Sequence, residues 1–160
     1  MAAVSNSSPL ILLAHIGRLD LLQALFTEVL VPPAVWREVV SDSVGRIGTL
    51  EVWQAGWIRQ RSLPRQGTPN SRAILHPGEA EAIALAVSMQ PAVAILLDDR
   101  RARRIARDIG LNVIGSGGAL VLAKDAGLIS SVRPILSDLY AAGLFLSERT
   151  ISELLTRANE

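Results

Sequence analysis

The chain has 160 residues, of which 49% are hydrophobic and 19% are charged, and its formal net charge is +1. This composition supports one domain with a substantial core over residues 1–160, and no apolar run approaches the roughly 20 residues that would cross a bilayer, so we expect a soluble cytoplasmic protein without a membrane partner. Because the chain has no cysteine, disulfides, thiolate zinc sites and a cysteine nucleophile are excluded.

Short apolar runs alternate with helical patterns in the first half of the chain. Gly17 separates the first two helical patterns, and Pro33 suits the first turn of the third because its missing N–H costs nothing there. We predict strands at 2–6, 28–31 and 57–63, and helices at 8–14, 19–25, 33–40 and 50–55. Residues 64–69 are expected to form a loop because proline and glycine punctuate them.

The second half begins with a helix predicted at 79–89, followed by a continuous apolar run at 92–97. Such a run is expected of a central parallel strand that is covered on both faces. A helix at 101–109, a strand at 111–114 and helices at 119–126, 132–142 and 147–157 complete the pattern. Repeated βα units of this kind predict a doubly wound α/β fold with a central, mainly parallel sheet.

Polar segments follow three of the predicted strands. They are Asn6-Ser7-Ser8, Asp98-Asp99-Arg100 and Gly115-Ser116-Gly117. Ligands of open α/β sheets bind beyond the carboxyl ends of the strands, so we expect these segments to line one edge and to form the functional site. Asn6 is placed both to cap the helix that follows and to face the other two segments.

Asp98 and Asp99 are adjacent carboxylates at the end of the predicted buried strand. They repel each other unless a cation or hydrogen-bond donors stabilise them, which favours a site for a cation. One aspartate could instead cap the following helix, but a single cap needs only one carboxylate. His15 and His76 lack the HxxxH spacing of a zinc site, so we expect any cation to be a hard ion bound by oxygen.

Glu79 and Glu81 lie in the first turn of the helix predicted at 79–89, where the helix macrodipole favours acidic residues. Because they are two residues apart they point to different faces, and only one is expected to face the edge of the sheet. Glu79 shares its stripe with apolar residues and is the preferred candidate. Glu38, taken alone, is typical of a solvated helix residue.

Four arginines share one face of the helix predicted at 101–109, namely Arg100, Arg103, Arg104 and Arg107. This face is either a solvated surface or a stripe that contacts the phosphate backbone of a nucleic acid beside Asp98 and Asp99. The chain has fifteen arginines and one lysine, and the planar guanidinium group suits phosphate. Arginine-rich codon usage would produce the same ratio.

Four segments occur in a recognisable order: VSNSSPLILLAHIGRLDLL, VLVPPAVWREV, HPGEAEAIALA and AILLDDRRARRIARDIGLNVIGSGGALVLAKDAGLI. Together they resemble PIN-like domains, and most closely the relatives of VapC-type toxins from prokaryotic toxin–antitoxin pairs. The resemblance covers residues 3–150. It implies a three-layer α/β/α fold and a metal-dependent endoribonuclease in which carboxylates hold Mg²⁺ or Mn²⁺ at the carboxyl edge of the sheet.

The resemblance also implies roles for individual residues. It places Asn6 at the family's first acidic position, Glu38 at the second, Glu79 or Glu81 at the third, and Asp98 or Asp99 at the fourth. The implied catalytic residues are Glu38, Glu79, Asp98 and Asp99; the implied metal ligands are Asn6, Glu79, Asp98 and Asp99; the hydroxyls of Ser8 and Ser116 are further candidates. The four arginines become candidate RNA contacts.

Asn6 departs from the family pattern, because relatives have Asp-Thr-Ser-Pro or Asp-Ser-Ser-Pro where this chain has Asn6-Ser7-Ser8-Pro9. An amide oxygen can bind Mg²⁺ but adds no negative charge to offset dehydration of the ion. The chain is therefore an attenuated or non-catalytic member, or the substitution was introduced to silence it. The alternative function is a catalytically degenerate PIN-like module that binds protein or RNA.

The resemblance further implies three partners, which are an RNA substrate, a cognate antitoxin protein and a second copy of the chain. Two apolar segments, Pro9–Leu13 and Leu19–Phe26, could support a homodimer. Packing in the core of the domain explains the same segments equally well.

Overall fold

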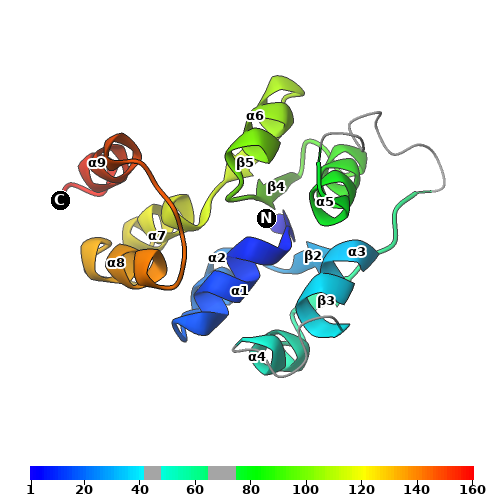
Figure 1. Cartoon of the computed structure of the whole chain (residues 1–160), viewed down its shortest axis with the longest axis horizontal. Coiled ribbons are helices and arrows are strands. Elements are labelled where there is room, and N and C mark those ends of the chain that lie inside the picture. Colours follow the sequence, from blue (N-terminus) through cyan, green and yellow to red (C-terminus); the bar gives the residue numbers. More distant parts are fainter. Residues whose placement is uncertain (42–47, 65–74) are drawn as a thin grey trace.

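The computed structural model describes residues 1–41, 48–64 and 75–160, and a parallel sheet in the strand order β3-β2-β1-β4-β5 lies at its centre (Figure 1). The strands are β1 (Ala2–Ser5), β2 (Val29–Val31), β3 (Ile58–Gln60), β4 (Val93–Leu96) and β5 (Asn112–Ile114). The chain starts in the middle of the sheet, adds β2 and β3 on one side, and crosses back to add β4 and β5 on the other. This is the predicted doubly wound α/β arrangement, so the predicted fold class is confirmed.

Helices cover both faces of this sheet. They are α1 (Ser7–His15), α2 (Asp20–Leu25), α3 (Pro33–Trp36), α4 (Thr49–Gln54), α5 (Pro77–Ser88), α6 (Arg100–Asp108), α7 (Ser116–Asp125), α8 (Arg133–Ala141) and α9 (Glu148–Arg157). In the parts of the chain that the structure describes, no helix is long and apolar enough to cross a membrane.

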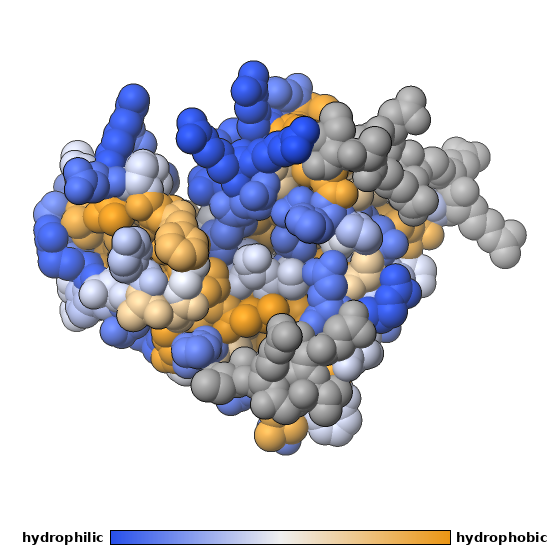
Figure 2. All heavy atoms as spheres, in the orientation of Figure 1, coloured by the Kyte–Doolittle hydropathy of each residue, from blue (hydrophilic) through white to orange (hydrophobic). Residues whose placement is uncertain are grey.

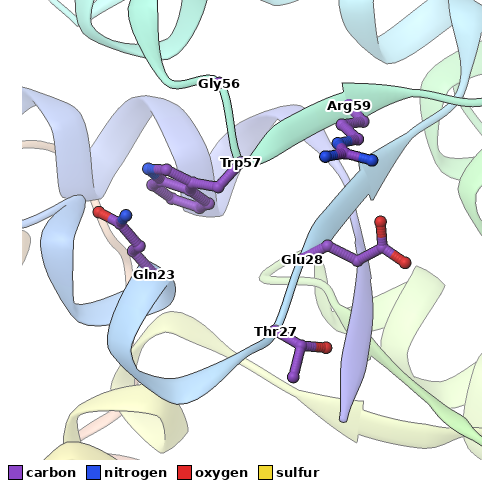
Figure 3. Close-up of a pocket in the computed structure, with 6 residues that line it drawn as sticks. All are labelled: Gln23, Thr27, Glu28, Gly56, Trp57 and Arg59. Atoms are coloured by element: carbon purple, nitrogen blue, oxygen red, sulfur yellow. The ribbon is translucent and has the colours of Figure 1, made fainter.

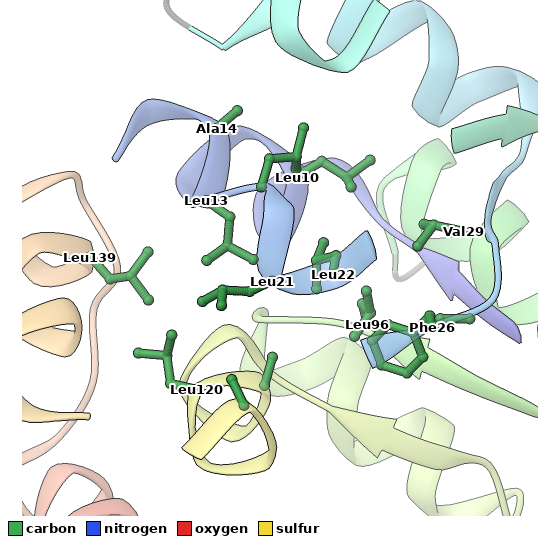
Figure 4. Packing of buried hydrophobic residues seen from close by; sticks show 14 of the residues in the cluster. Leu10, Leu13, Ala14, Leu21, Leu22, Phe26, Val29, Leu96, Leu120 and Leu139 are labelled. Carbon is green, nitrogen blue, oxygen red and sulfur yellow. The ribbon is translucent and has the colours of Figure 1, made fainter. Parts of the chain in front are cut away.

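The strands have apolar residues on both faces, because alternate side chains of a strand point in opposite directions. Ala3 and Leu96 belong to a large cluster with α1, α2 and α7, seen in Figure 4, whereas Val4 and Ile95 belong to a second cluster with α5 and α6. The sheet is therefore the middle layer of three, with its central strands buried on both sides.

The two apolar segments that could support a dimer contribute mainly to the larger cluster. Leu10, Leu13 and Leu22 are fully buried, and Figure 4 shows Leu13 pointing toward Leu21 and Leu120. Each fully buried leucine contributes about 1.5–3 kcal/mol to folding. Core packing therefore accounts for these segments without a partner.

Three predicted elements differ from the structure or fall partly outside it. The helix predicted at 33–40 is α3 followed by a π-helical turn, η1 (Arg37–Ser41). The helix predicted from Ala119 begins at Ser116, because Gly115 is extended at its N-cap position and an aspartate side chain satisfies the first backbone N–H. The loop predicted at 64–69 lies outside the described residues apart from Pro64.

Candidate functional site

The three polar segments meet at the carboxyl edge of the sheet, as predicted. The backbone N–H of Asn6 donates to the carbonyl oxygen of Leu96 at 3.0 Å, which joins the end of β1 to the end of β4. The N–H of Leu97 donates to the carbonyl oxygen of Ile114, also at 3.0 Å, and joins β4 to β5. The polar residues that follow these strands are thus held at one edge, where ligands of doubly wound folds bind.

Asn6 is buried at this edge, with only 4% of its surface exposed. It occupies the N-cap position of α1 in an extended conformation, but its side chain makes no capping hydrogen bond. Within the described parts of the chain, its Oδ1 accepts only a long hydrogen bond, 3.5 Å, from Ser7 Oγ. The expected position at the helix start is correct, whereas the expected capping bond is absent, so the helix does not require this amide oxygen.

Glu79, the third residue of α5, is a nearly buried carboxylate with 7% of its surface exposed. Burial raises the pKa of this carboxyl, and the negative charges of Asp99 and Glu38 raise it further. A hydrogen bond from the backbone N–H of His76, at 3.2 Å, acts in the opposite direction. We call Glu38, Glu79 and Asp99 the acid cluster, because the charges of Glu38 and Asp99 both act on Glu79.

Glu38 reaches the acid cluster from the π-helical turn η1, over the first turn of α5. Its carboxylate lies against Gly78, where an added Cβ would be 2.6 Å from Oε1 and 2.8 Å from Oε2. Only a residue without a side chain permits this approach. π-Helical turns occur frequently at functional sites, so the position of Glu38 in such a turn supports a functional role for this residue.

Asp98 and Asp99 have different surroundings. Asp98 accepts hydrogen bonds from the N–H of Ser116 at 2.7 Å and from its Oγ at 2.6 Å, so both carboxylate oxygens hold the start of α7. Burial raises the pKa of Asp98, while these two bonds and the charge of Arg103 oppose the rise. Asp99 Oδ1 accepts from the N–H of Ala102 at 2.8 Å and caps α6.

One aspartate was expected to be able to cap the following helix, and Asp99 does so; the other also has a role in the fold, because a second helix starts beside the end of β4. Asp98 serves α7 and Asp99 serves α6. Asp99 differs in that its Oδ2 has no hydrogen-bond partner within the described ranges. Of the two, Asp99 is therefore the one with an oxygen available to a ligand.

Glu81 has a role in the fold. Its Oε2 accepts a hydrogen bond from the N–H of Ala34 at 2.9 Å, in the first turn of α3. The two glutamates point to different places, as their spacing predicts: Glu79 to the acid cluster and Glu81 to α3. This arrangement agrees with the preference for Glu79, which remains a prediction about the site.

The acid cluster has the chemistry of a hard-cation site. Its three carboxylates and the amide of Asn6 at the same edge offer the oxygen ligands that Mg²⁺ and Mn²⁺ accept. Among the residues that the structure describes, no three histidine or acidic side chains are close enough together to form a preassembled metal site. The types of donor suit a hard divalent ion, and the carboxylates would have to move together to bind it.

The four arginines of α6 separate into two pairs. Arg103 and Arg107 line a cavity together with Asp98, whereas Arg100 and Arg104 are exposed outside it. Arg104 lies 4.0 Å from Asp108 in an exposed ion pair on the same helix. The four arginines therefore do not form one uniform stripe, because only Arg103 and Arg107 face the cavity.

The two candidate hydroxyls also differ. Ser116 is buried, and its hydroxyl donates a hydrogen bond to Asp98, so it positions that carboxylate and the start of α7. Ser8 is half-buried in the first turn of α1, with no hydrogen bond from its hydroxyl to any described residue.

A cavity of about 520 Å³ opens at the other edge of the sheet (Figure 3). Figure 3 shows Gln23 and Trp57 on one side of the opening and Glu28 and Arg59 on the other. Glu28 precedes β2 and Trp57 precedes β3, so the cavity lies at the amino ends of these strands. It is separate from the acid cluster, and we assign it no function.

Three residues contribute to the site although the sequence reasoning did not select them. His76 donates its backbone N–H to Glu79 in the manner of a capping box, which the order His76-Pro77-Gly78-Glu79 could have indicated. Gly78 leaves room for Glu38. Arg157 lines the same cavity as Arg103, and no local signal indicates this because the two lie on different helices.

Comparisons with known proteins agree with this fold. A family model described as a PIN domain matches residues 2–160. A PilT N-terminus domain protein from the hyperthermophilic archaeon Sulfolobus solfataricus P2 superposes with a TM-score of 0.59 and 16% identity, over 77% of this chain and 93% of that chain. At this identity the likeness shows the fold alone. A search of curated proteins finds no match. The family match covers nearly the whole chain, and the chain therefore belongs to the PIN domain family.

Proposed function

We propose that the acid cluster serves the metal-dependent hydrolysis of RNA phosphodiester bonds. One observation carries the proposal: the buried carboxylate of Glu79 lies within the electrostatic reach of Glu38 and Asp99, at the edge where doubly wound folds bind ligands. Burial makes the charge of Glu79 unfavourable in the free protein, the nearby charges of Asp99 and Glu38 add to this, and a divalent cation would relieve it. The nuclease-type fold of the family supports the same reading.

The residues at this edge would have two roles, as ligands of the metal ion and as positioning residues. When bound, a divalent ion supplies neutralisation of the phosphate charge and activation of a water nucleophile. Glu79, Glu38 and Asp99 would hold it, with the amide oxygen of Asn6 as an uncharged ligand. Asp98 is a positioning residue, because Ser116 occupies both of its oxygens. The expected products are a 5′-phosphate and a 3′-hydroxyl.

Asn6 sets the expected level of activity. It offers an oxygen but no charge, so metal affinity is expected to be lower than in a relative with aspartate at this position. We therefore propose an attenuated ribonuclease.

The finer parts of the proposal rest on the resemblance to toxin ribonucleases. They are a role as the toxin of a toxin–antitoxin pair, binding of a cognate antitoxin, a homodimer and a cytoplasmic location. The buried leucines of α1 and α2 do not contribute to the dimer proposal, because they pack within the chain.

A second candidate function is a binding module without catalysis. It is favoured by Asn6, which adds no charge to the site, and by the bonds of both aspartates to helix starts, since the two aspartates would remain useful to the fold after catalysis was lost. RNA cleavage discriminates between the two candidates.

The test is cleavage of diverse single-stranded RNAs in Mn²⁺ by the wild-type chain, Glu79→Gln and Glu81→Gln. Glu81 lies on the same helix and undergoes the same substitution, and glutamine can still accept the bond from Ala34. We expect Glu79→Gln to lower cleavage by roughly 100-fold and Glu81→Gln to change it little. If neither the wild-type chain nor Asn6→Asp cleaves any RNA, the ribonuclease proposal fails and the binding module replaces it.

A further inference from the structure

Beside the carboxyl edge, a groove runs along the open side of β5, the edge strand of the sheet. It has a volume of about 300 Å³, at the lower end of the roughly 300–1,000 Å³ typical of small-ligand sites. Its lining comes from β5, from the start of α7, and from α6 and α9. We call it the β5 groove; it is large enough for a nucleotide unit and too small for a folded partner.

The β5 groove collects positive charge from two helices. Arg103 and Arg107 enter from α6, and Arg157 enters from the last turn of α9. Among the described residues that line the groove, Asp98 is the only acidic one, and both of its oxygens accept hydrogen bonds from Ser116. Three guanidinium groups therefore line the groove with one carboxylate, and this part of the lining has a net positive charge.

Arg103 lines the groove, and one hydrogen-bond donor of its guanidinium group has no partner among the described residues. Its Nε is buried and has no hydrogen-bond partner in the part of the chain that the structure describes. Burial lowers the pKa of Arg103, as does the charge of Arg107, while Asp98 acts in the opposite direction. The guanidinium lies over Gly115, where an added Cβ would be 3.0 Å from Nη1. A buried donor next to a like charge is stabilised by an anion.

We propose that the β5 groove binds a backbone phosphate of single-stranded RNA and so positions the strand across the acid cluster. The inference rests on the proposed function, because it gives that site its substrate contact. Asp98 lines the groove and directly precedes Asp99 of the acid cluster, so a strand that leaves the groove on this side would reach the carboxylates. Guanidinium groups bind phosphate with two parallel hydrogen bonds, which a lysine cannot reproduce.

Neighbouring arginines show that this is a local site and not a general property of the surface. Arg104 on α6 pairs with Asp108, and Arg149 on α9 pairs with Glu153 at 2.8 Å; neither lines the groove. Figure 2 shows hydrophilic side chains over α6 and over α9, with the outline of the molecule indented between them. These exposed arginines provide matched controls on the same two helices.

The test measures binding of a labelled single-stranded RNA by fluorescence anisotropy in EDTA, so that no cleavage occurs. The variants are Arg107→Gln and Arg157→Gln, with Arg104→Gln and Arg149→Gln as controls. We expect each groove variant to raise Kd about fivefold or more and to lower the slope of log K against log salt by about 0.7, the value for one phosphate contact on a single strand. The controls are expected to stay within about twofold.

Competition separates the possible ligands. Excess inorganic phosphate or nucleoside monophosphate is expected to compete weakly, because each offers only one contact and no continuing strand. Equal weakening by all four variants, or no weakening by either groove variant, would overturn the proposal. So would displacement of the RNA by an acidic peptide at lower concentration than by unlabelled RNA. Because binding is measured without metal, these outcomes are independent of whether the wild-type chain cleaves RNA.

Discussion

Glu38 and Gly78 show how one residue's size controls the position of another's charge. The Glu38 carboxylate occupies the space that a Cβ at Gly78 would need. Gly78 lies in the first turn of α5 and its backbone does not require glycine, since its φ is not in the left-handed region. Substitution of Gly78 by alanine can therefore displace the Glu38 carboxylate without disturbing the fold.

Gly78→Ala should move the Glu38 carboxylate away from the acid cluster. Alanine is favoured over glycine in a helix by about 0.5–1 kcal/mol, so we expect the free energy of unfolding to stay within about 1 kcal/mol of the wild-type value. RNA cleavage should fall about tenfold or more, because small displacements of a catalytic group have large effects. Urea denaturation and a cleavage assay measure the two quantities.

Gly56→Ala is the matched control for this substitution, because an added Cβ at Gly56 meets no atom within 4 Å. It should leave cleavage unchanged. Equal activity of Gly78→Ala and Gly56→Ala would show that the position of Glu38 does not matter for the reaction.

At the scale of elements, Glu160 joins α7, α8 and the residues after α9. Its Oε1 accepts hydrogen bonds from Lys124 Nζ at 2.8 Å and from the N–H of Val132 at 2.6 Å. Its Oε2 accepts from Ser131 Oγ at 2.8 Å and from the N–H of Arg133 at 3.1 Å. The bond from Lys124 is the main cause of a pKa lowered to about 2, with smaller contributions from the other donors.

The lowered pKa of Glu160 predicts a pH dependence of stability. A carboxyl group whose pKa is lower in the folded chain stabilises the fold above its ordinary pKa of 4.5, and this contribution is lost as the pH falls toward 2. We expect Glu160→Gln to be less stable than the wild type at pH 7, and the difference to shrink below pH 4.5. Urea denaturation at pH 7 and pH 3 measures this; an equal difference at both would contradict it.

Elements defined by local pattern could be predicted from the sequence. The apolar run at 92–97 predicts a central strand, and β4 pairs with β1 on one side and β5 on the other. Gly17, with φ of +68°, separates α1 from α2 as expected. These predictions succeed because periodicity and turn residues act over a few positions along the chain.

Elements that depend on packing could not be predicted. The π-helical turn that carries Glu38 has no local signature in the sequence, and it matters because it lies over Gly78, which is distant along the chain. The two aspartates were distinguishable only after both helix starts were placed beside β4. The β5 groove could not be predicted because Arg103 and Arg157, which both line it, lie on helices that are far apart in the sequence.

At the scale of the whole molecule, the carboxyl edge of the doubly wound sheet and its edge strand β5 carry the two features on which the proposed function rests, the acid cluster and the β5 groove. The acid cluster lies at the carboxyl ends of the strands, and the β5 groove leads away from it along the edge strand. Hydrogen bonds within the chain hold this edge in place, as those from Ser116 do for Asp98. A substrate strand would contact the groove and the cluster at once.

Calorimetric titration of Mn²⁺ into the wild-type chain, Asn6→Asp and Glu79→Gln tests most directly whether this edge is a cation site. We predict measurable but weak binding by the wild type, binding about tenfold tighter by Asn6→Asp because a fourth carboxylate joins the set, and loss of binding by Glu79→Gln. The same Mn²⁺ affinity in all three chains would contradict a cation site at the acid cluster.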